Sequence, residues 1–151
     1  MSNANQDGVI IRPMTRSDIH AILTLDRKFA GTRGSLSYKD LATLDPGGPL
    51  DVSFVAETAG NIIGHLIARL EYVMIPFVEV CLVQGILVDP MYQSRGIGSR
   101  LFRELLDYCQ TEGVYTIRTL VEEHNDELQR FVTRLGFHRS TIINYDKTFE
   151  T

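Results

Sequence analysis

The sequence of 151 residues lacks the features that mark a membrane-spanning or a secreted protein. No uninterrupted apolar run approaches the roughly 18 residues of a membrane-spanning helix, so no membrane partner is expected. Residues 1–8, MSNANQDG, are polar and have neither the basic start nor the apolar core of a signal peptide. We expect them to form a flexible N-terminal extension of a soluble, cytoplasmic protein.

Cysteine is scarce, with only Cys81 and Cys109 in the chain. Both lie in apolar stretches, and neither has the paired spacing of a metal site, so no metal ion is expected. We interpret both as buried free thiols, which fits a reducing compartment.

Positive charge is not in excess, because 15 lysines and arginines stand against 19 aspartates and glutamates, a formal net charge of −4. Nucleic-acid binding needs a dense basic surface, so no nucleic-acid partner is expected. A small anionic ligand stays compatible with this balance, because a local basic loop can lie on an acidic protein. The hydrophobic fraction of 44% is typical of a globular protein with a core, and the length favours a single domain over residues 1–151.

Apolar periodicity predicts the element order β-α-α-β-β-β-α-β-α-β, with one more strand if the end of the chain folds as a hairpin. The expected strands are Val9–Met14, Val52–Thr58, Ile62–Val73, Phe77–Val88, Tyr115–Val121 and Phe137–Phe149. The expected helices are Thr15–Ala30, with Thr15 and Asp18 as a capping box, Tyr38–Leu44, Gly96–Glu112, and a helix from Asn125 to Gly136. Phe77–Val88 is apolar on both faces and is therefore placed centrally in the sheet, with a bulge or a close backbone approach at Gly85.

The stretch Gln93–Arg100, QSRGIGSR, has two glycines and two arginines between a central strand and a helix. A helix N-terminus presents unpaired N–H groups, glycines let a phosphate approach them, and arginine adds charge-assisted contacts. The stretch therefore predicts a phosphate or pyrophosphate ligand, although a plain turn would explain the glycines alone. The Walker pattern GxxxxGK[ST] is absent, and Leu101 breaks the dinucleotide pattern GxGxxG.

The longer stretch Ile86–Phe102, ILVDPMYQSRGIGSRLF, resembles the core motif Q/R-x-x-G-x-G/A of the GCN5-related N-acetyltransferase (GNAT) family. Asn125–Phe137 resembles the family's second motif, N-x-x-A-x-x-x-Y-x-x-x-G-F. The element order is also similar to that of the family, so the resemblance covers nearly the whole chain. It implies an α/β fold with a mixed, mostly antiparallel central sheet flanked by helices.

The resemblance implies acetyl-CoA as the acyl donor. Its pyrophosphate would lie on the amides of Arg95 to Ser99, and its pantetheine arm would pair like a strand with Ile86 and Val88, where the fourth and fifth strands part. A backbone N–H near the bulge would polarise the thioester carbonyl. The cofactor-binding residues that the resemblance implies are Ile86, Leu87, Val88, Gln93, Ser94, Arg95, Gly96, Ile97, Gly98, Ser99 and Asn125. Asn125 is equally well explained as a helix N-cap.

The expected catalytic residues are Glu79 and Tyr145. Relatives use a glutamate on the fourth strand as general base, which implies Glu79, although a solvated edge residue is the alternative and Glu71 lies nearby. Val132 stands where the family has the tyrosine that reprotonates the thiolate. Tyr145 is the expected substitute; Tyr115, water, or no acid at all are alternatives.

The mid-strand His65 is interpreted as a satisfied core histidine in preference to a catalytic one, and Cys81 as a packing residue in preference to a nucleophile.

The function expected from the resemblance is transfer of an acetyl group from acetyl-CoA to a primary amine by direct attack. A non-catalytic acyl-CoA-binding regulatory or sensor domain is the alternative, and a plain interaction domain without CoA binding is the third. The acceptor, a small molecule or a protein amine, would meet residues Leu25–Leu44 and Phe137–Phe149. Its identity stays open, as does the oligomeric state, a homodimer included.

Overall fold

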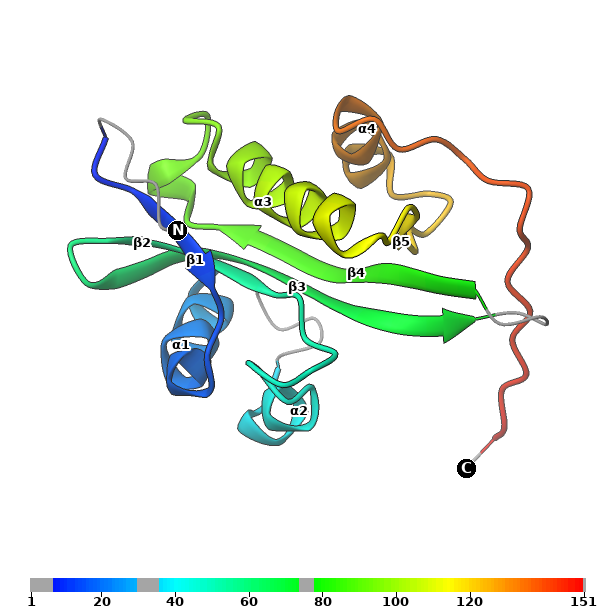
Figure 1. Cartoon of the computed structure of the whole chain (residues 1–151), viewed down its shortest axis with the longest axis horizontal. Helices are drawn as coiled ribbons and strands as arrows, with labels where there is room; N and C mark the ends of the chain where they lie inside the picture. Colours follow the sequence, from blue (N-terminus) through cyan, green and yellow to red (C-terminus); the bar gives the residue numbers. More distant parts are fainter. Residues whose placement is uncertain (1–6, 30–35, 74–77, 151) are drawn as a thin grey trace. The chain divides into compact units, whose positions relative to one another are not determined.

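The computed structural model describes residues 7–29, 36–73 and 78–150. The chain divides into two compact units, residues 1–120 and 121–151. The first unit holds a sheet with α3 on one face and α1 and α2 on the other (Figure 1). The second unit holds α4 and the C-terminal segment. Of the predicted N-terminal extension, residues 1–6 lie outside the described residues, whereas Asp7 is ion-paired with Arg100 at 3.3 Å.

The sheet has five strands in the spatial order β1-β2-β3-β4-β5. All neighbours are antiparallel except β4 and β5, which are parallel. The mixed, mostly antiparallel sheet is thus confirmed, and β4 lies between two other strands as its apolar faces predicted. The strands are β1 (Ile10–Pro13), β2 (Phe54–Thr58), β3 (Asn61–Val73), β4 (Val78–Val88) and β5 (Ile117–Thr119).

The four predicted helices are present, the first of them with a start four residues later than predicted. They are α1 (Ile19–Phe29), α2 (Tyr38–Thr43), α3 (Ile97–Glu112) and α4 (Asp126–Arg134). The predicted capping box is confirmed, because the Thr15 amide donates to Asp18 Oδ2 at 2.8 Å. It begins a short 3₁₀ turn, η1 (Arg16–Asp18), so that α1 starts only after it.

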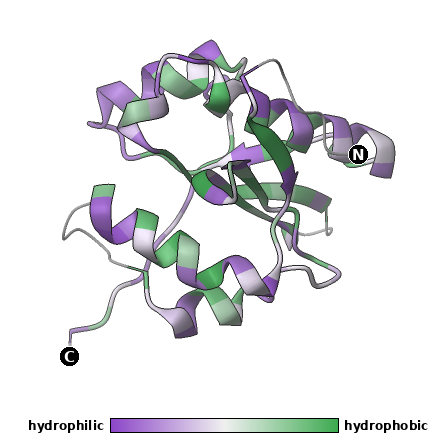
Figure 2. Cartoon of the chain, turned by 90° about the vertical axis from the view of Figure 1, so that its left-hand side faces the viewer, coloured by the Kyte–Doolittle hydropathy of each residue, from purple (hydrophilic) through white to green (hydrophobic). Residues whose placement is uncertain are grey.

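Two apolar clusters stabilise the first unit, one on each face of the sheet. Leu101 and Leu105 of α3 are fully buried against strand residues such as Leu66. On the opposite face, Ile22 of α1 and Leu41 of α2 are buried in a second cluster. Figure 2 shows the hydrophobic colouring concentrated on the strands between the helices. Burial of this kind is the main stabilising contribution.

The predicted final strand, Phe137–Phe149, is wrong. Residues 137–150 form neither helix nor strand, and the side chains of residues 138–150 are exposed. A strand is stable only where a neighbour accepts its ladder hydrogen bonds and its apolar side chains are covered. Neither condition holds for Ile143 or Phe149, which are 72% and 75% exposed. The β5 strand is likewise shorter than predicted, at three residues.

Candidate active site

The sheet forks where β5 ends. Among the described residues, β4 pairs with β5 only at Cys81, Leu82 and Val83, and the edge of β4 from Gln84 to Val88 has no strand neighbour there. A bulge lies at the same place, because Ile67 pairs with Gly85 while Ala68 pairs with Val83. The predicted bulge at Gly85 is therefore confirmed, with Gln84 as the extra residue.

The open edge carries the backbone groups of Ile86 and Val88. The Asp89 amide donates to the Ile63 carbonyl at 2.8 Å, so the pair Asp89–Ile63 is a hydrogen-bonded pair of the antiparallel ladder. Along an antiparallel strand, the N–H and C=O groups of successive residues point alternately toward this neighbour and away from it. By this parity and the register of β3 with β4, Ile86 and Val88 direct their N–H and C=O groups away from β3, toward the open edge. An extended ligand carrying amides could pair there.

A tight loop follows this edge and leads into α3. Pro90–Tyr92 forms a 3₁₀ turn that begins where the Asp89 side chain accepts from the Met91 amide at 2.9 Å. The Gln93 side chain donates to the Val88 carbonyl at 3.1 Å and so holds the loop against the end of β4. Ser94 and Gly96 both have left-handed backbone, with φ of 65° and 74°.

The N-terminus of α3 has no side-chain cap, because its N-cap residue is Gly96. A helix N-terminus without a cap leaves N–H groups directed outward, and the positive end of the helix dipole favours an anion there. The residues predicted from the core motif, from Ile86 to Ser99, thus come together as one strand edge and one loop.

The two arginines of the motif have different surroundings. Arg95 is exposed, with its guanidinium 5.2 Å from the centre of the Tyr92 ring. Arg100 instead donates to the Val9 carbonyl at 2.7 Å and pairs with Asp7, which ties α3 to the start of β1. Arg95 is therefore the arginine placed for an anion at this loop. The sequence analysis did not predict a role for Tyr92. An aromatic residue three positions before Arg95 could have indicated this contact between ring and guanidinium.

Of the two predicted catalytic residues, only Glu79 belongs to the unit that carries the strand edge and the loop. Glu79 is near the start of β4, nine residues before Val88, which at the usual strand rise is about 30 Å. It pairs with Tyr72 of β3, and its hydrogen bond raises the pKa of that tyrosine. The alternative, Glu71, is ion-paired with Arg69 at 3.0 Å. Tyr145 belongs to the second unit and is 88% exposed.

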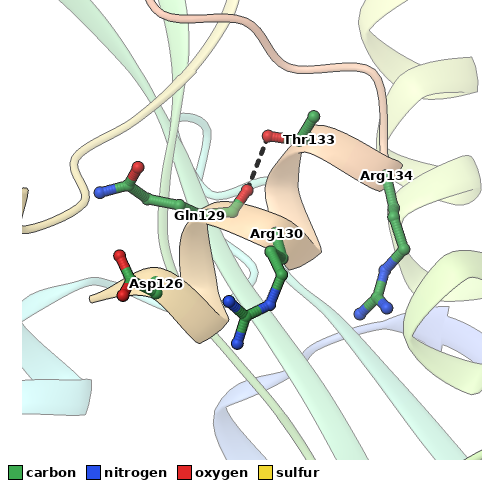
Figure 3. A pocket seen from close by; sticks show the side chains of 5 residues that line it. All are labelled: Asp126, Gln129, Arg130, Thr133 and Arg134. Carbon is green, nitrogen blue, oxygen red and sulfur yellow. Dashed lines mark hydrogen bonds between the residues drawn. The ribbon is translucent and has the colours of Figure 1, made fainter. Parts of the chain in front are cut away.

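The second unit carries the second motif. The Asn125 side chain accepts from the Leu128 amide at 3.1 Å, so its prediction as the N-cap of α4 is confirmed. Val132 is half-buried, and its carbonyl accepts from the Phe137 amide at 3.0 Å. Figure 3 shows a pocket on this helix lined by Asp126, Gln129, Arg130, Thr133 and Arg134, with the Thr133 hydroxyl bonded to the Gln129 carbonyl. The sequence predicted none of these five as site residues, since their pattern is that of an ordinary solvated helix face.

His65 is buried as predicted, at 3% exposed, but it is not satisfied. Among the described residues, neither ring nitrogen has a hydrogen-bond partner. Burial lowers the pKa of His65 to about 4, opposed by the nearby charge of Asp26.

Both cysteines are confirmed as buried free thiols. The hydrogen bond between them, with burial, raises the pKa of Cys81. Within the described ranges, no group of three or more His, Cys, Asp or Glu could hold a metal ion. The described part of the chain also has no helix long and apolar enough to cross a membrane.

Several proteins are similar to this chain in sequence, and others are similar in fold. An uncharacterized N-acetyltransferase of Methanocaldococcus jannaschii is 29% identical over 94 residues, 62% of this chain and 42% of the relative. The N-alpha-acetyltransferase RimI of Mycobacterium tuberculosis is 47% identical over 58 residues, 38% of this chain and 34% of the relative. The chain thus spans less than half the length of these curated relatives in the matched regions.

The structure of AAC(6′)-Iy in complex with the bisubstrate analogue CoA-S-monomethyl-acetylneamine has the same fold. It superposes with a TM-score of 0.76 at 21% identity, covering 93% of this chain and 99% of that one. The sequence also matches the Acetyltransferase (GNAT) family over residues 18–137, a range that includes the fork, the glycine loop and the second motif. The chain therefore belongs to the GNAT acetyltransferase family.

Proposed function

We propose that this protein transfers an acetyl group from acetyl-CoA to a primary amine. The observation that carries the proposal is the open edge of β4, which leads directly into an uncapped, glycine-lined helix N-terminus. An edge that pairs amides, followed by a site for anions, suits pantetheine and pyrophosphate in that order. The CoA analogue bound to AAC(6′)-Iy, a protein of the same fold, supports this assignment.

The cofactor contacts follow from this placement. The backbone groups of Ile86 and Val88 pair with the pantetheine amides, and Leu87 lies between them. The amides of Arg95–Ser99 hold the pyrophosphate, helped by the Arg95 guanidinium, while Gln93 and Ser94 shape the loop. Asn125, at the head of α4, is proposed as a further contact.

The chemical step is direct attack. The amine nitrogen adds to the thioester carbonyl carbon, a C–N bond forms, the C–S bond breaks, and CoA leaves as a thiolate. Glu79, the acidic residue of β4, is our proposed acceptor of the amine proton, and since it lies about 20 Å along the strand from the bulge at Gly85, the proton would reach it through a chain of water molecules. Tyr145 is our proposed donor of a proton to the thiolate, since Val132 has no proton to give.

The acceptor class is a primary amine of a small molecule or a protein, met in the cytoplasm. Relatives and fold neighbours include an enzyme named for the alanine of ribosomal protein bS18 and several aminoglycoside acetyltransferases. Both acceptor types present an exposed amine that must be neutral to attack.

A second candidate function is acyl-CoA sensing without turnover, and Val132 at the position of the motif's tyrosine favours it. The experiment that separates the two is release of free CoA from acetyl-CoA, measured with a panel of aminoglycosides, small amines and peptides with free N-termini. Acetyl-CoA binding with amine-dependent release supports the transferase. Binding without release for every amine supports the sensor, and no binding contradicts both.

A further inference from the structure

Gly85 lies inside β4 at the fork, and the fold itself does not require a glycine there. Its φ is outside the left-handed region that favours glycine, and the extra residue of the bulge is Gln84. A Cβ on Gly85 would meet no described atom within 4 Å. A glycine inside a strand weakens it and often marks a close approach of a ligand to the backbone. The space over Gly85 therefore points to a ligand.

The two faces of β4 differ at this place. Val83, Ile86 and Val88 pack against the apolar cluster that includes α3, so that face of the strand is filled. Gly85 is opposite Ile67 in the ladder and shares its face, on which Ile67 is buried in the cluster of α1 and α2. Among the described residues, β4 contributes no side chain to this second cluster. The face of β4 that is turned away from α3 is thus open at Gly85.

The proposed cofactor would bring its acyl group to this opening. Its pyrophosphate belongs to the loop after β4 and its pantetheine pairs with Val88 and Ile86, so the thioester comes next along the edge, beside Gly85. Further along, β5 closes the fork by pairing with β4 up to Val83. The acyl group therefore has to leave the plane of the sheet, and the face at Gly85 has room for it.

We propose that the protein also transfers acyl groups longer than acetyl, such as the propionyl group of propionyl-CoA, and that Gly85 determines this donor range. The proposal rests on the proposed use of acetyl-CoA and extends it. The extra methylene lies over Gly85, between the half-buried side chains of Leu82 and Leu87, which the register places on the same face. The chemical step is unchanged: the amine nitrogen bonds to the acyl carbonyl carbon, the C–S bond breaks, CoA leaves as a thiolate, and Glu79 takes the amine proton through water.

The test uses Gly85→Ala, which adds one methyl group to the open face. Gly60→Ala is the matched control, because a Cβ on Gly60 also meets no described atom within 4 Å, but Gly60 lies in the turn between β2 and β3 with a φ of 78°. Affinities for CoA, acetyl-CoA and propionyl-CoA are measured by calorimetry, and amine-dependent CoA release is measured with both donors. The melting temperature is measured without ligand.

The wild type should bind propionyl-CoA about as tightly as acetyl-CoA and release CoA from both. Gly85→Ala should weaken propionyl-CoA binding about tenfold, because the added methyl group takes the space of the extra methylene. Its affinity for free CoA, which has no acyl group, should not change. Gly60→Ala should bind all three ligands as the wild type does.

The melting temperatures test whether the fold needs the glycine. Gly85→Ala should raise the melting temperature, because alanine fits this backbone without a clash and loses less conformational entropy on folding. Gly60→Ala should lower it, because the positive φ of that residue opposes a side chain. A Gly85→Ala variant that melts below the wild type would show that the fold requires the glycine, and would overturn the proposal.

Failure of this proposal differs from failure of the proposed function. The longer-acyl proposal is overturned, and acetyl transfer stands, if the wild type releases CoA from acetyl-CoA alone or binds propionyl-CoA more than about tenfold more weakly than acetyl-CoA. An unchanged ratio of the two affinities in Gly85→Ala overturns it as well. A wild type that binds none of the three ligands would overturn the proposed function and this proposal with it.

Discussion

His65 links the stability of the first unit to pH. Its pKa is about 4 in the folded protein and near the ordinary 6.5 when unfolded. As pH falls through 6.5 the unfolded chain takes up the proton first, so stability is full above this value and is lost toward pH 4. The free energy of unfolding lost in this way is about 3 kcal/mol.

We therefore expect His65→Leu to flatten the fall in stability between pH 7 and pH 5, measured by urea unfolding. His20→Leu is the control, because His20 is exposed on α1 and contacts the ring of Tyr38 at 5.2 Å. Removing two buried nitrogens that have no hydrogen-bond partner among the described residues should also raise stability at neutral pH. Identical pH slopes for His65→Leu and the wild type would contradict this account.

Gly96 and Gly98 are predicted to be needed for acetyl-CoA and not for folding alone. A Cβ on Gly96 would meet no described atom within 4 Å, so the protein itself leaves room for a side chain there. The cost of a side chain comes from the positive φ of this residue and from the space that the bound ligand needs. Gly96→Val and Gly98→Val should each weaken acetyl-CoA binding strongly, by calorimetry on folded protein.

Gly113 provides the matched control for this substitution. It ends α3 with a φ of 77° and is equally open, but it lies at the opposite end of the helix from the loop. Gly113→Val should carry a similar strain and bind acetyl-CoA normally. Unchanged affinity in both loop variants would remove the pyrophosphate assignment.

Glu79 is predicted to accept the proton of the amine, and Tyr145 to donate a proton to the CoA thiolate. Glu79→Gln should lower kcat/KM mainly below neutral pH, where an unassisted amine is almost wholly protonated. Tyr145→Phe should lower kcat with little change in acetyl-CoA affinity. A general acid or base contributes on the order of 10²–10⁴-fold. A loss below about tenfold with the true acceptor would exclude that residue and leave orientation of the substrates as the main source of rate.

At the scale of elements, α4 depends on its N-cap. Asn125→Ala should destabilise the helix by about 1 kcal/mol, whereas Asn125→Asp keeps the cap and matches the helix dipole. If Asn125 also contacts acetyl-CoA, Asn125→Asp should weaken binding of this anionic ligand while α4 amide exchange stays slow. Weakened binding in Asn125→Ala alone, in step with faster exchange, would assign Asn125 a purely structural role.

The elements that the sequence predicted well have local signals. The α3 helix combines a 3.6-residue apolar repeat with a glycine at each end, and β4 is an apolar run that ends at Asp89–Pro90. The glycine loop was predictable for the same reason, since its residues are contiguous.

The features that the sequence did not predict depend on residues far apart in the chain. The apolar side chains between Phe137 and Phe149 suit a strand, but only a neighbouring strand could stabilise one. The Glu79–Tyr72 pair and the Thr119–Val83 bond are set by register, which no local pattern encodes. That His65 has no hydrogen-bond partner in the described part of the chain likewise follows from packing and not from a local sequence pattern.

At the scale of the whole molecule, the first unit carries both halves of the proposed cofactor site, the open edge of β4 and the loop before α3. The chain as a whole is negatively charged, with a net charge of −4. The positive character of the proposed site therefore comes from the N–H groups of the helix N-terminus and from Arg95. We expect recognition of acetyl-CoA to depend on the pairing of pantetheine as much as on phosphate, so other phosphate-bearing cofactors should bind poorly.

The most direct test of acetyl-CoA recognition is the melting temperature with each ligand at equal concentration. A ligand that binds only the native state stabilises it by RT ln(1 + [L]/Kd), roughly 2.7 kcal/mol at a hundredfold excess over Kd. We predict a clear rise in Tm with acetyl-CoA and far smaller shifts with NAD and ATP. Equal shifts with all three, or no shift with acetyl-CoA, would contradict a site built for pantetheine and pyrophosphate together.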